Sequence, residues 1–89
     1  MTDHHHSHKA IVQRLKRADG HLRKIIEMIE DGRPCVDVAQ QLAAVEAAVS
    51  QAKQTFIRDH IDNCLGHAAS GEGDPRSALD ELKQISKYL

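Results

Sequence analysis

Hydrophobic residues recur at spacings of three and four through the first third of the chain. An α-helix brings residues at these spacings onto one side, so the pattern predicts an amphipathic helix from about Ser7 to Glu30. Ser7 is a suitable N-terminal cap for such a helix. The predicted apolar stripe consists of Ile11, Leu15, Ala18, Leu22, Ile25 and Ile29.

A second and longer helix is predicted after the break Asp31-Gly32-Arg33-Pro34. Glycine suits the C-terminus of one helix, and proline suits the first turn of the next. No glycine or proline occurs from Cys35 to Leu65, so this stretch is predicted to form a single helix. Its apolar stripe consists of Val38, Leu42, Val45, Val49, Ala52 and Phe56.

The segment from Gly66 to Pro75 is rich in glycine and is predicted to be a flexible connection. A short third helix is expected from about Arg76 to Leu89. No stretch alternates as a β-strand would, so the predicted class is all-α, a three-helix protomer with a long central helix. We divide the chain into a flexible His-rich tail, residues 1–8, and a single helical domain, residues 9–89. The third helix presents Leu79, Leu82, Ile85 and Leu89 to the core.

The size of the chain predicts self-association. A domain of 89 residues buries only about 60–65% of the surface that its unfolded chain would expose. Its two aromatic residues of the Phe, Tyr and Trp type, Phe56 and Tyr88, are too few for a dense small core. Subunit interfaces are therefore expected to supply much of the apolar burial, in a homo-oligomer.

The N-terminal segment does not resemble a signal peptide, and no run of about 18 apolar residues could span a bilayer. We therefore expect a cytoplasmic protein without membrane contact. Cytosolic reductants keep thiols free, so the two cysteines are more typical of ligands or reactive groups than of a structural disulfide.

His60 and Cys64 are the clearest candidates for metal ligands. They lie four residues apart on the predicted long helix, which puts their Cβ atoms about 5–6 Å apart on one face, a separation that one metal ion can bridge. Cys35 lies about 37 Å away along the same helix. If two copies of this helix pack antiparallel, however, Cys35 of one chain meets His60 and Cys64 of the other. These three residues are thus predicted to form an intersubunit transition-metal site.

Two other interpretations of these residues stay open. The cysteines could be small core residues beside a solvated histidine, or Cys35 and Cys64 could form an intersubunit disulfide in a redox-regulated DNA-binding protein. The position of both cysteines at opposite ends of one helix favours the metal site. We do not expect an enzyme, because the sequence shows no nucleophile and base pair beyond cysteine and histidine.

The N-terminal tail contributes further histidines, namely His4, His5, His6 and His8. Such a tract could be part of an expression tag or an unspecific metal trap. It is short and interrupted by Ser7, which favours native sequence in which one histidine supplies a fourth ligand. His21 and His67 are expected to be surface residues.

The formal net charge of −1 hides an uneven distribution, because residues 9–24 contain six basic residues and one acidic residue. A basic helix of this kind suits contacts with the phosphates of double-stranded operator DNA, although an ordinary solvated helix surface is the alternative. The sequence contains no helix-turn-helix signature, so contacts to the DNA backbone are expected to dominate. The candidate DNA contacts are Arg14, Arg17, Lys9 and Lys16.

The residues that carry these features resemble the CsoR/RcnR family of copper-sensing and nickel/cobalt-sensing repressors, which also contains formaldehyde and persulfide sensors. The likeness rests on the stretch from Arg14 to His21, on Cys35, on the stretch from Gln40 to Val45 and on the stretch from Asp59 to Cys64. It implies an antiparallel dimer that doubles into a tetramer, and metal-triggered release from operator DNA.

The resemblance also implies ligand positions. Cys35, His60 and Cys64 match the three core ligands, and His4 is nearest in register to the N-terminal histidine of the nickel/cobalt sensors. Persulfide sensors lack the histidine that His60 supplies, and formaldehyde sensors lack the second cysteine. Pro34 stands where copper sensors often have tyrosine, and Glu46 stands where several relatives have an arginine thought to face DNA.

The predicted metal depends on the tail. Two thiolates and one imidazole suit trigonal Cu(I), whereas an additional tail nitrogen gives a set that suits square-planar Ni(II) or tetrahedral Co(II) and Zn(II). With four histidines in the first eight residues, we favour Ni(II) or Co(II), with Cu(I) or Zn(II) as the alternatives. The sequence thus predicts a repressor that Ni(II) or Co(II) releases from DNA to allow metal efflux; the alternative is a Cu(I) sensor of the same family.

Overall fold

The computed structural model describes residues 3–71 and 73–89, and the side chains of all of these except residues 3–7 and 67–69. They form three helices, α1 (Asp3–Glu30), α2 (Cys35–Ala69) and α3 (Pro75–Ser86). The described residues contain no β-strand, which confirms the all-α class and the long central helix.

The helix boundaries differ from the predicted ones. α1 begins at Asp3, so Ser7 lies inside the helix and does not cap it. The backbone of the His-rich segment is therefore helical from Asp3 onward. α2 continues through Gly66 to Ala69, because a single glycine costs a helix only about 1 kcal/mol and does not stop it. α3 ends at Ser86 rather than at the end of the chain.

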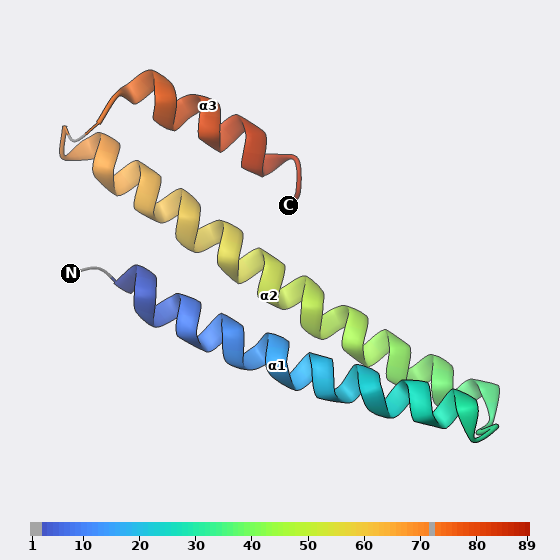
Figure 1. The fold of residues 1–89 in the computed structure, drawn as a ribbon. Coiled ribbons are helices and arrows are strands. Elements are labelled where there is room, and N and C mark those ends of the chain that lie inside the picture. The colour runs from blue at the N-terminus through green and yellow to red at the C-terminus, as the bar shows by residue number, and fades with distance from the viewer. Residues whose placement is uncertain (1–2, 72) are drawn as a thin grey trace.

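The turn between α1 and α2 reverses the chain. Gly32 adopts a positive φ of 72°, a conformation that glycine accepts without steric cost, and the Arg33 amide donates to the Met28 carbonyl at 3.0 Å. Pro34 directly precedes α2, and its carbonyl accepts a hydrogen bond from the Val38 amide at 3.1 Å. As a result, α1 and α2 lie side by side and antiparallel (Figure 1).

A second reversal places α3 against the C-terminal half of α2, on the side away from α1 (Figure 1). Asp74 caps α3, since its Oδ1 atom accepts from the Arg76 amide at 3.1 Å, and Pro75 occupies the first turn. Glu81 in the middle of α3 is thereby carried back beside the last turns of α2.

The core of the protomer is a line of small and branched side chains between α1 and α2, which we call the buried seam. Two contacts between the helices set its register, a hydrogen bond between His21 and Gln41 and a ring stack between His8 and Phe56. In this register three pairs of residues, seven apart along each helix, lie at the same level: Ile11 with Ala52, Ala18 with Val45, and Ile25 with Val38.

A second line of apolar side chains lies beside the buried seam and stays open to solvent in the single chain; we call it the exposed seam. The described part of the molecule measures 57 × 26 × 14 Å, and its smallest dimension is about the thickness of one helix. The three helices therefore form a single layer, and none of them covers this line of side chains. Its six apolar residues are 42–57% exposed: Leu15, Leu22, Ile29, Leu42, Val49 and Phe56. Each predicted stripe of α1 and α2 thus divides into a buried half and an exposed half.

Replacing Ile25 with alanine should lower the free energy of unfolding by about 2–4 kcal/mol, because Ile25 is 1% exposed and its loss leaves a cavity in the buried seam. Val36 is 68% exposed, and its replacement with alanine is the matched control, with an expected change below about 0.5 kcal/mol. Urea unfolding at one fixed protein concentration measures both. Equal losses in the two variants would contradict the assignment of the core.

Candidate metal centre and nucleic-acid interface

His60, Cys64 and Glu81 form a cluster of potential metal ligands. His60 Nε2 donates to Glu81 Oε1 at 2.9 Å, and the Cys64 thiol lies 3.6 Å from His60 Nε2 and 3.9 Å from Glu81 Oε2. One ligand atom from each of the three residues lies within 4.8 Å of the others. Two helices therefore bring together an imidazole, a thiol and a carboxylate.

Local structure explains this convergence. His60 and Cys64 are one helical turn apart on α2 and project from one face, as their spacing predicts. Glu81 reaches them because α3 folds back along α2. The His60 side chain is 26% exposed and that of Glu81 is 55% exposed, so the cluster lies at the protein surface and can be reached by an ion from solvent.

The surroundings of Cys64 favour its protonated form. Partial burial raises the pKa of the Cys64 thiol, and the negative charge of Glu81 and the hydrogen bond to it raise the pKa further. A metal binds the thiolate, so metal binding at Cys64 must release a proton. The positive charge of an ion would offset the repulsion between the thiolate and the Glu81 carboxylate.

The His60 and Cys64 atoms fit a transition metal ion. With metal–sulfur and metal–nitrogen bonds of about 2.3 and 2.1 Å and a tetrahedral angle, the two donor atoms are about 3.6 Å apart. The distance between His60 Nε2 and Cys64 Sγ has this value, 3.6 Å. The pair supplies one soft and one intermediate donor, which suits Cu(I), Ni(II), Co(II) or Zn(II) better than Mg(II) or Ca(II).

Cys35 lies outside this cluster. It is the exposed first residue of α2, whereas His60 and Cys64 occupy the far end of the same helix. Within one chain, Cys35 is thus separated from His60 and Cys64 by most of the length of α2, as the sequence predicts. The side chain of His4 lies outside the described residues, although its backbone belongs to the first turns of α1.

Phe56 links the first turns of α1 to the cluster. The His8 ring stacks on Phe56 with 5.2 Å between centroids, and Phe56 precedes His60 by one helical turn. Phe56, His60, Glu81 and Tyr88 also line an open cavity of about 530 Å³ between α2 and α3. The N-terminal segment of α1 therefore runs close to the candidate metal ligands.

Asp59, the neighbour of His60, contains a buried oxygen atom. Its Oδ2 is shielded from solvent and has no hydrogen-bond partner. Buried carboxylate oxygens without a donor are uncommon in folded proteins, since each loses its hydration without compensation. No pattern in the sequence had indicated a special role for Asp59.

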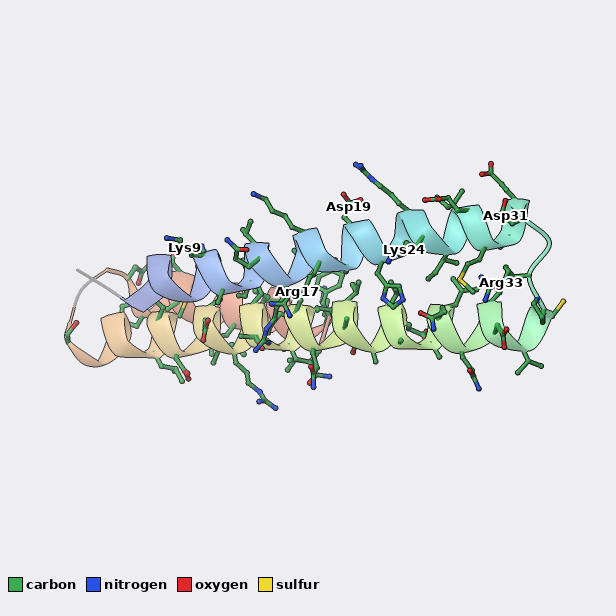
Figure 2. All side chains as sticks on the ribbon, turned by 90° about the horizontal axis from the view of Figure 1, so that it is seen from below. Lys9, Arg17, Asp19, Lys24, Asp31 and Arg33 are labelled. Carbon is green, nitrogen blue, oxygen red and sulfur yellow. The ribbon has the colours of Figure 1, made fainter. Side chains whose placement is uncertain are left out.

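A basic groove lies between α1 and α2, away from the cluster. Arg14, Arg17 and His21 of α1 and Gln51 of α2 line a hollow of about 460 Å³, and His21 and Lys24 line an adjoining one. All four predicted DNA contacts are exposed on α1, but Lys9 and Lys16 do not line the groove. Figure 2 shows Lys9, Arg17 and Lys24 spaced along α1.

His21 differs from the sequence prediction. It was expected at the surface, but it is half-buried, and its ring donates to Gln41 Oε1 across the two helices. The predicted stripe of α1 left His21 on its polar side, and only the position of α2 reveals the contact. The side chain of His67 lies outside the described residues.

Residues 7–88 match the family model of metal-sensitive transcriptional repressors. The chain belongs to this family. It is 39% identical over 80 residues to the copper-sensing transcriptional repressor CsoR of Mycobacterium ulcerans, a match that covers 90% of this chain and 68% of the relative. It is 38% identical over 77 residues to the CsoR of Bacillus subtilis, covering 86% and 75% of the two chains.

A solved structure of the nickel-responsive transcriptional regulator InrS has the same fold as this metal-sensitive repressor. The TM-score is 0.80 at 35% sequence identity, and the match covers 91% of both chains. These matches confirm the family resemblance inferred from the sequence. The similar proteins include copper-sensing repressors and a nickel-responsive regulator, so the matches do not identify the metal. Within the described residues, no helix of this repressor is long and apolar enough to cross a membrane.

Glu81 is the member of the cluster that the sequence did not identify. Asp80 and Glu81 are adjacent carboxylates on α3, and no local pattern distinguishes them. The choice depends on how α3 docks on α2. Asp59 escaped notice for a similar reason, because the burial of its Oδ2 atom depends on tertiary packing.

Replacing Glu81 with glutamine should make the Cys64 thiol of the metal-free repressor react several-fold faster with iodoacetamide near neutral pH. Removing the negative charge lowers the raised pKa of Cys64 toward its ordinary value, which increases the thiolate fraction. Mass spectrometry can follow the modification of Cys64 separately from that of Cys35. A slower or unchanged reaction of Cys64 would rule out this electrostatic effect.

Proposed function

We propose that this protein is a Ni(II)- or Co(II)-responsive transcriptional repressor of the cytoplasm. It binds operator DNA without metal and is released when the metal binds at an intersubunit site, which derepresses metal efflux. The main support is the His60 and Cys64 pair, held at metal-binding distance next to the His-rich start of α1 in a chain that belongs to a metal-sensing repressor family.

The proposed site draws its third ligand from a second subunit. Cys35 belongs to the same seven-residue column of α2 as Leu42, Val49 and Phe56 of the exposed seam. If two α2 helices pack antiparallel with the symmetry axis near Val49, Cys35 of the partner subunit lies opposite the turn from His60 to Cys64. The contact that covers the exposed seam would then also complete the metal site.

Dimers of this kind would pair into the tetramer that the family resemblance implies. Half-exposed apolar residues are also present on α1, at Val12 and Ile26, outside the α2 column. They offer further surface for such a pairing. The proposed repressor is therefore a homotetramer in which the metal sites lie between subunits.

The preference for Ni(II) or Co(II) rests on His4. α1 is helical from Asp3, and the His8–Phe56 stack brings its start beside the turn that precedes His60. An imidazole from this segment would join Cys35, His60 and Cys64 in a set of two sulfur and two nitrogen atoms, which suits these ions. The structural likeness to nickel-responsive InrS agrees with this choice.

A Cu(I) sensor is the second candidate, and the similarity to copper-sensing CsoR proteins favours it. Cu(I) would need only the two thiolates and His60. Titration of the reduced protein and of a variant without residues 1–8 separates the candidates. Loss of the tail weakens Ni(II) binding if the tail supplies a ligand and leaves Cu(I) binding unchanged.

The basic groove is the proposed contact with DNA. Arg14 and Arg17 face its hollow, and Lys9 and Lys16 extend the positive charge along the exposed side of α1. Assembly repeats this surface, so that it can follow successive phosphates of the duplex. Metal binding would change the position of α1, because the start of this helix borders the metal site. Couplings of about 1–3 kcal/mol weaken DNA binding some 5- to 150-fold.

Replacing His60 with alanine should leave DNA binding intact and abolish its release by Ni(II). Arg17→Ala should instead weaken DNA binding in the absence of metal and lower its dependence on salt, because a phosphate contact is lost. Fluorescence anisotropy with operator DNA at several salt concentrations measures both effects. DNA release by Ni(II) in the His60→Ala protein, with an unchanged midpoint, would refute the proposed sensing site.

Mixing two inactive variants tests the intersubunit site. Cys35→Ala and His60→Ala homodimers should each lack the complete ligand set, whereas a mixed dimer contains one intact site. Random assortment of subunits then restores about a quarter of the wild-type sites, since half of the dimers are mixed and one of their two sites is intact. Thiolate-to-Ni(II) charge-transfer absorption reports the recovery. No recovery after verified subunit exchange would place Cys35 outside the site.

A further inference from the structure

Gly20 lies in the middle of α1, where a glycine weakens the helix. Glycine is less favourable than alanine in a helix interior, because it loses more conformational freedom on folding. Gly20 is not one of the glycines with a positive φ, so its backbone does not require the absence of a side chain. A Cβ atom added at this position would meet no other atom within 4 Å. Nothing in the described part of the chain therefore explains why position 20 has no side chain.

The surface of α1 around Gly20 is strongly basic. Residues three and four positions before and after it are its neighbours on the helix surface, and all of them are exposed. They are Lys16, Arg17, Arg23 and Lys24. Asp19 is the only acidic residue from position 16 to position 24, and it pairs with Arg23 at 3.4 Å. The other three basic residues form no ion pair with a described residue, so their charges remain available to an anion.

Gly20 also forms part of the wall of the basic groove. Together with His21, Lys24 and Gln41 it lines a hollow of about 470 Å³. His21 also lines the larger hollow that contains Arg17, so the two hollows adjoin at this residue. Arg17 and Lys24 lie on either side of Gly20 along α1, about 10 Å apart along the helix axis (Figure 2). The groove thus exposes bare helix backbone between two cationic side chains.

We propose that Gly20 is the point at which the sugar–phosphate backbone of bound DNA approaches α1 most closely. A phosphate at this point would lie against the helix backbone, between Arg17 and Lys24. Glycine suits a place where the protein backbone must come close to a ligand, because a Cβ atom would hold the ligand away. This inference rests on the proposed function, because it assigns a positioning residue within the proposed DNA contact.

The surroundings of Gly20 favour DNA over a second subunit as the occupant of this place. The cores of subunit interfaces are depleted of charged residues, whereas basic residues surround Gly20. The half-exposed apolar residues of α1, Val12 and Ile26, lie about 80° and 120° from Gly20 around the helix axis. They are on the side of Gly20 away from His21 and the groove. A polyanion therefore fits this position better than an apolar helix face does.

The test compares Gly20→Ala and Gly20→Leu with the wild type in the full-length, metal-free protein. Both new side chains favour a helix and neither changes the charge, so the melting temperature should rise by a few degrees. The affinity for DNA should nevertheless fall, about 10-fold for alanine and further for leucine, because the phosphate is held away from Arg17 and Lys24. Fluorescence anisotropy at low salt with a labelled duplex of arbitrary sequence is sufficient, since phosphate contacts carry no sequence information.

Gly66→Ala is the matched control. Gly66 also lies inside a helix, α2, and a Cβ atom added there likewise meets no atom within 4 Å. This variant should gain thermal stability in the same way but keep the wild-type affinity for DNA, because Gly66 does not line the basic groove. Sedimentation velocity should show the same oligomeric state for the wild type and for Gly20→Ala.

The outcomes separate this inference from the proposed function. If Arg17→Ala weakens DNA binding but Gly20→Ala does not, the role of Gly20 is wrong and the proposed DNA contact stands. Equal losses of DNA affinity in Gly20→Ala and Gly66→Ala would also overturn the role of Gly20. A changed oligomeric state in Gly20→Ala would assign the position to a subunit contact instead. If Arg17→Ala binds the duplex as the wild type does, the proposed DNA contact itself fails, and this inference fails with it.

Discussion

The structure depends on the packing of α1 against α2 along a single line of small and branched side chains. Three helices in one layer can bury only one side of each apolar stripe, so Leu22, Val49 and Phe56 stay half-exposed in the single chain. A chain that leaves this much apolar surface open gains stability by covering it with another subunit. A subunit that covers this surface would also contribute to the proposed metal site, because Cys35 begins the α2 column that contains Leu42, Val49 and Phe56.

Carboxylates surround the two described ligands of the candidate metal centre. Glu81 of α3 accepts a hydrogen bond from the ring of His60 and contacts the thiol of Cys64, and Asp59 directly precedes His60 on α2 with its Oδ2 atom buried. In the proposed function, a change in the charge of the centre on metal binding would therefore act on α3 through Glu81.

The chain is similar in sequence to copper-sensing repressors and shares its fold with a nickel-responsive regulator. In this chain the His60 and Cys64 geometry suits several soft or intermediate ions, so these two residues do not decide the metal. Selectivity must come from groups that differ in number or position around them. In this chain the helical start of α1, which lies along α2 next to Phe56, is the segment best placed to supply such a group.

The sequence by itself determined the helical class, the family and the His60 and Cys64 pair, because helical periodicity and a spacing of four are local properties that survive any packing. It also separated Cys35 from His60 and Cys64 within one chain, since a helix has a fixed rise per residue. The sequence did not predict that α1 begins at Asp3 or that α2 continues through Gly66, because helix ends depend on neighbouring contacts. Only the tertiary structure decided that Glu81 rather than Asp80 joins the cluster and that one oxygen of Asp59 is buried, since both follow from how the helices pack and not from any local pattern.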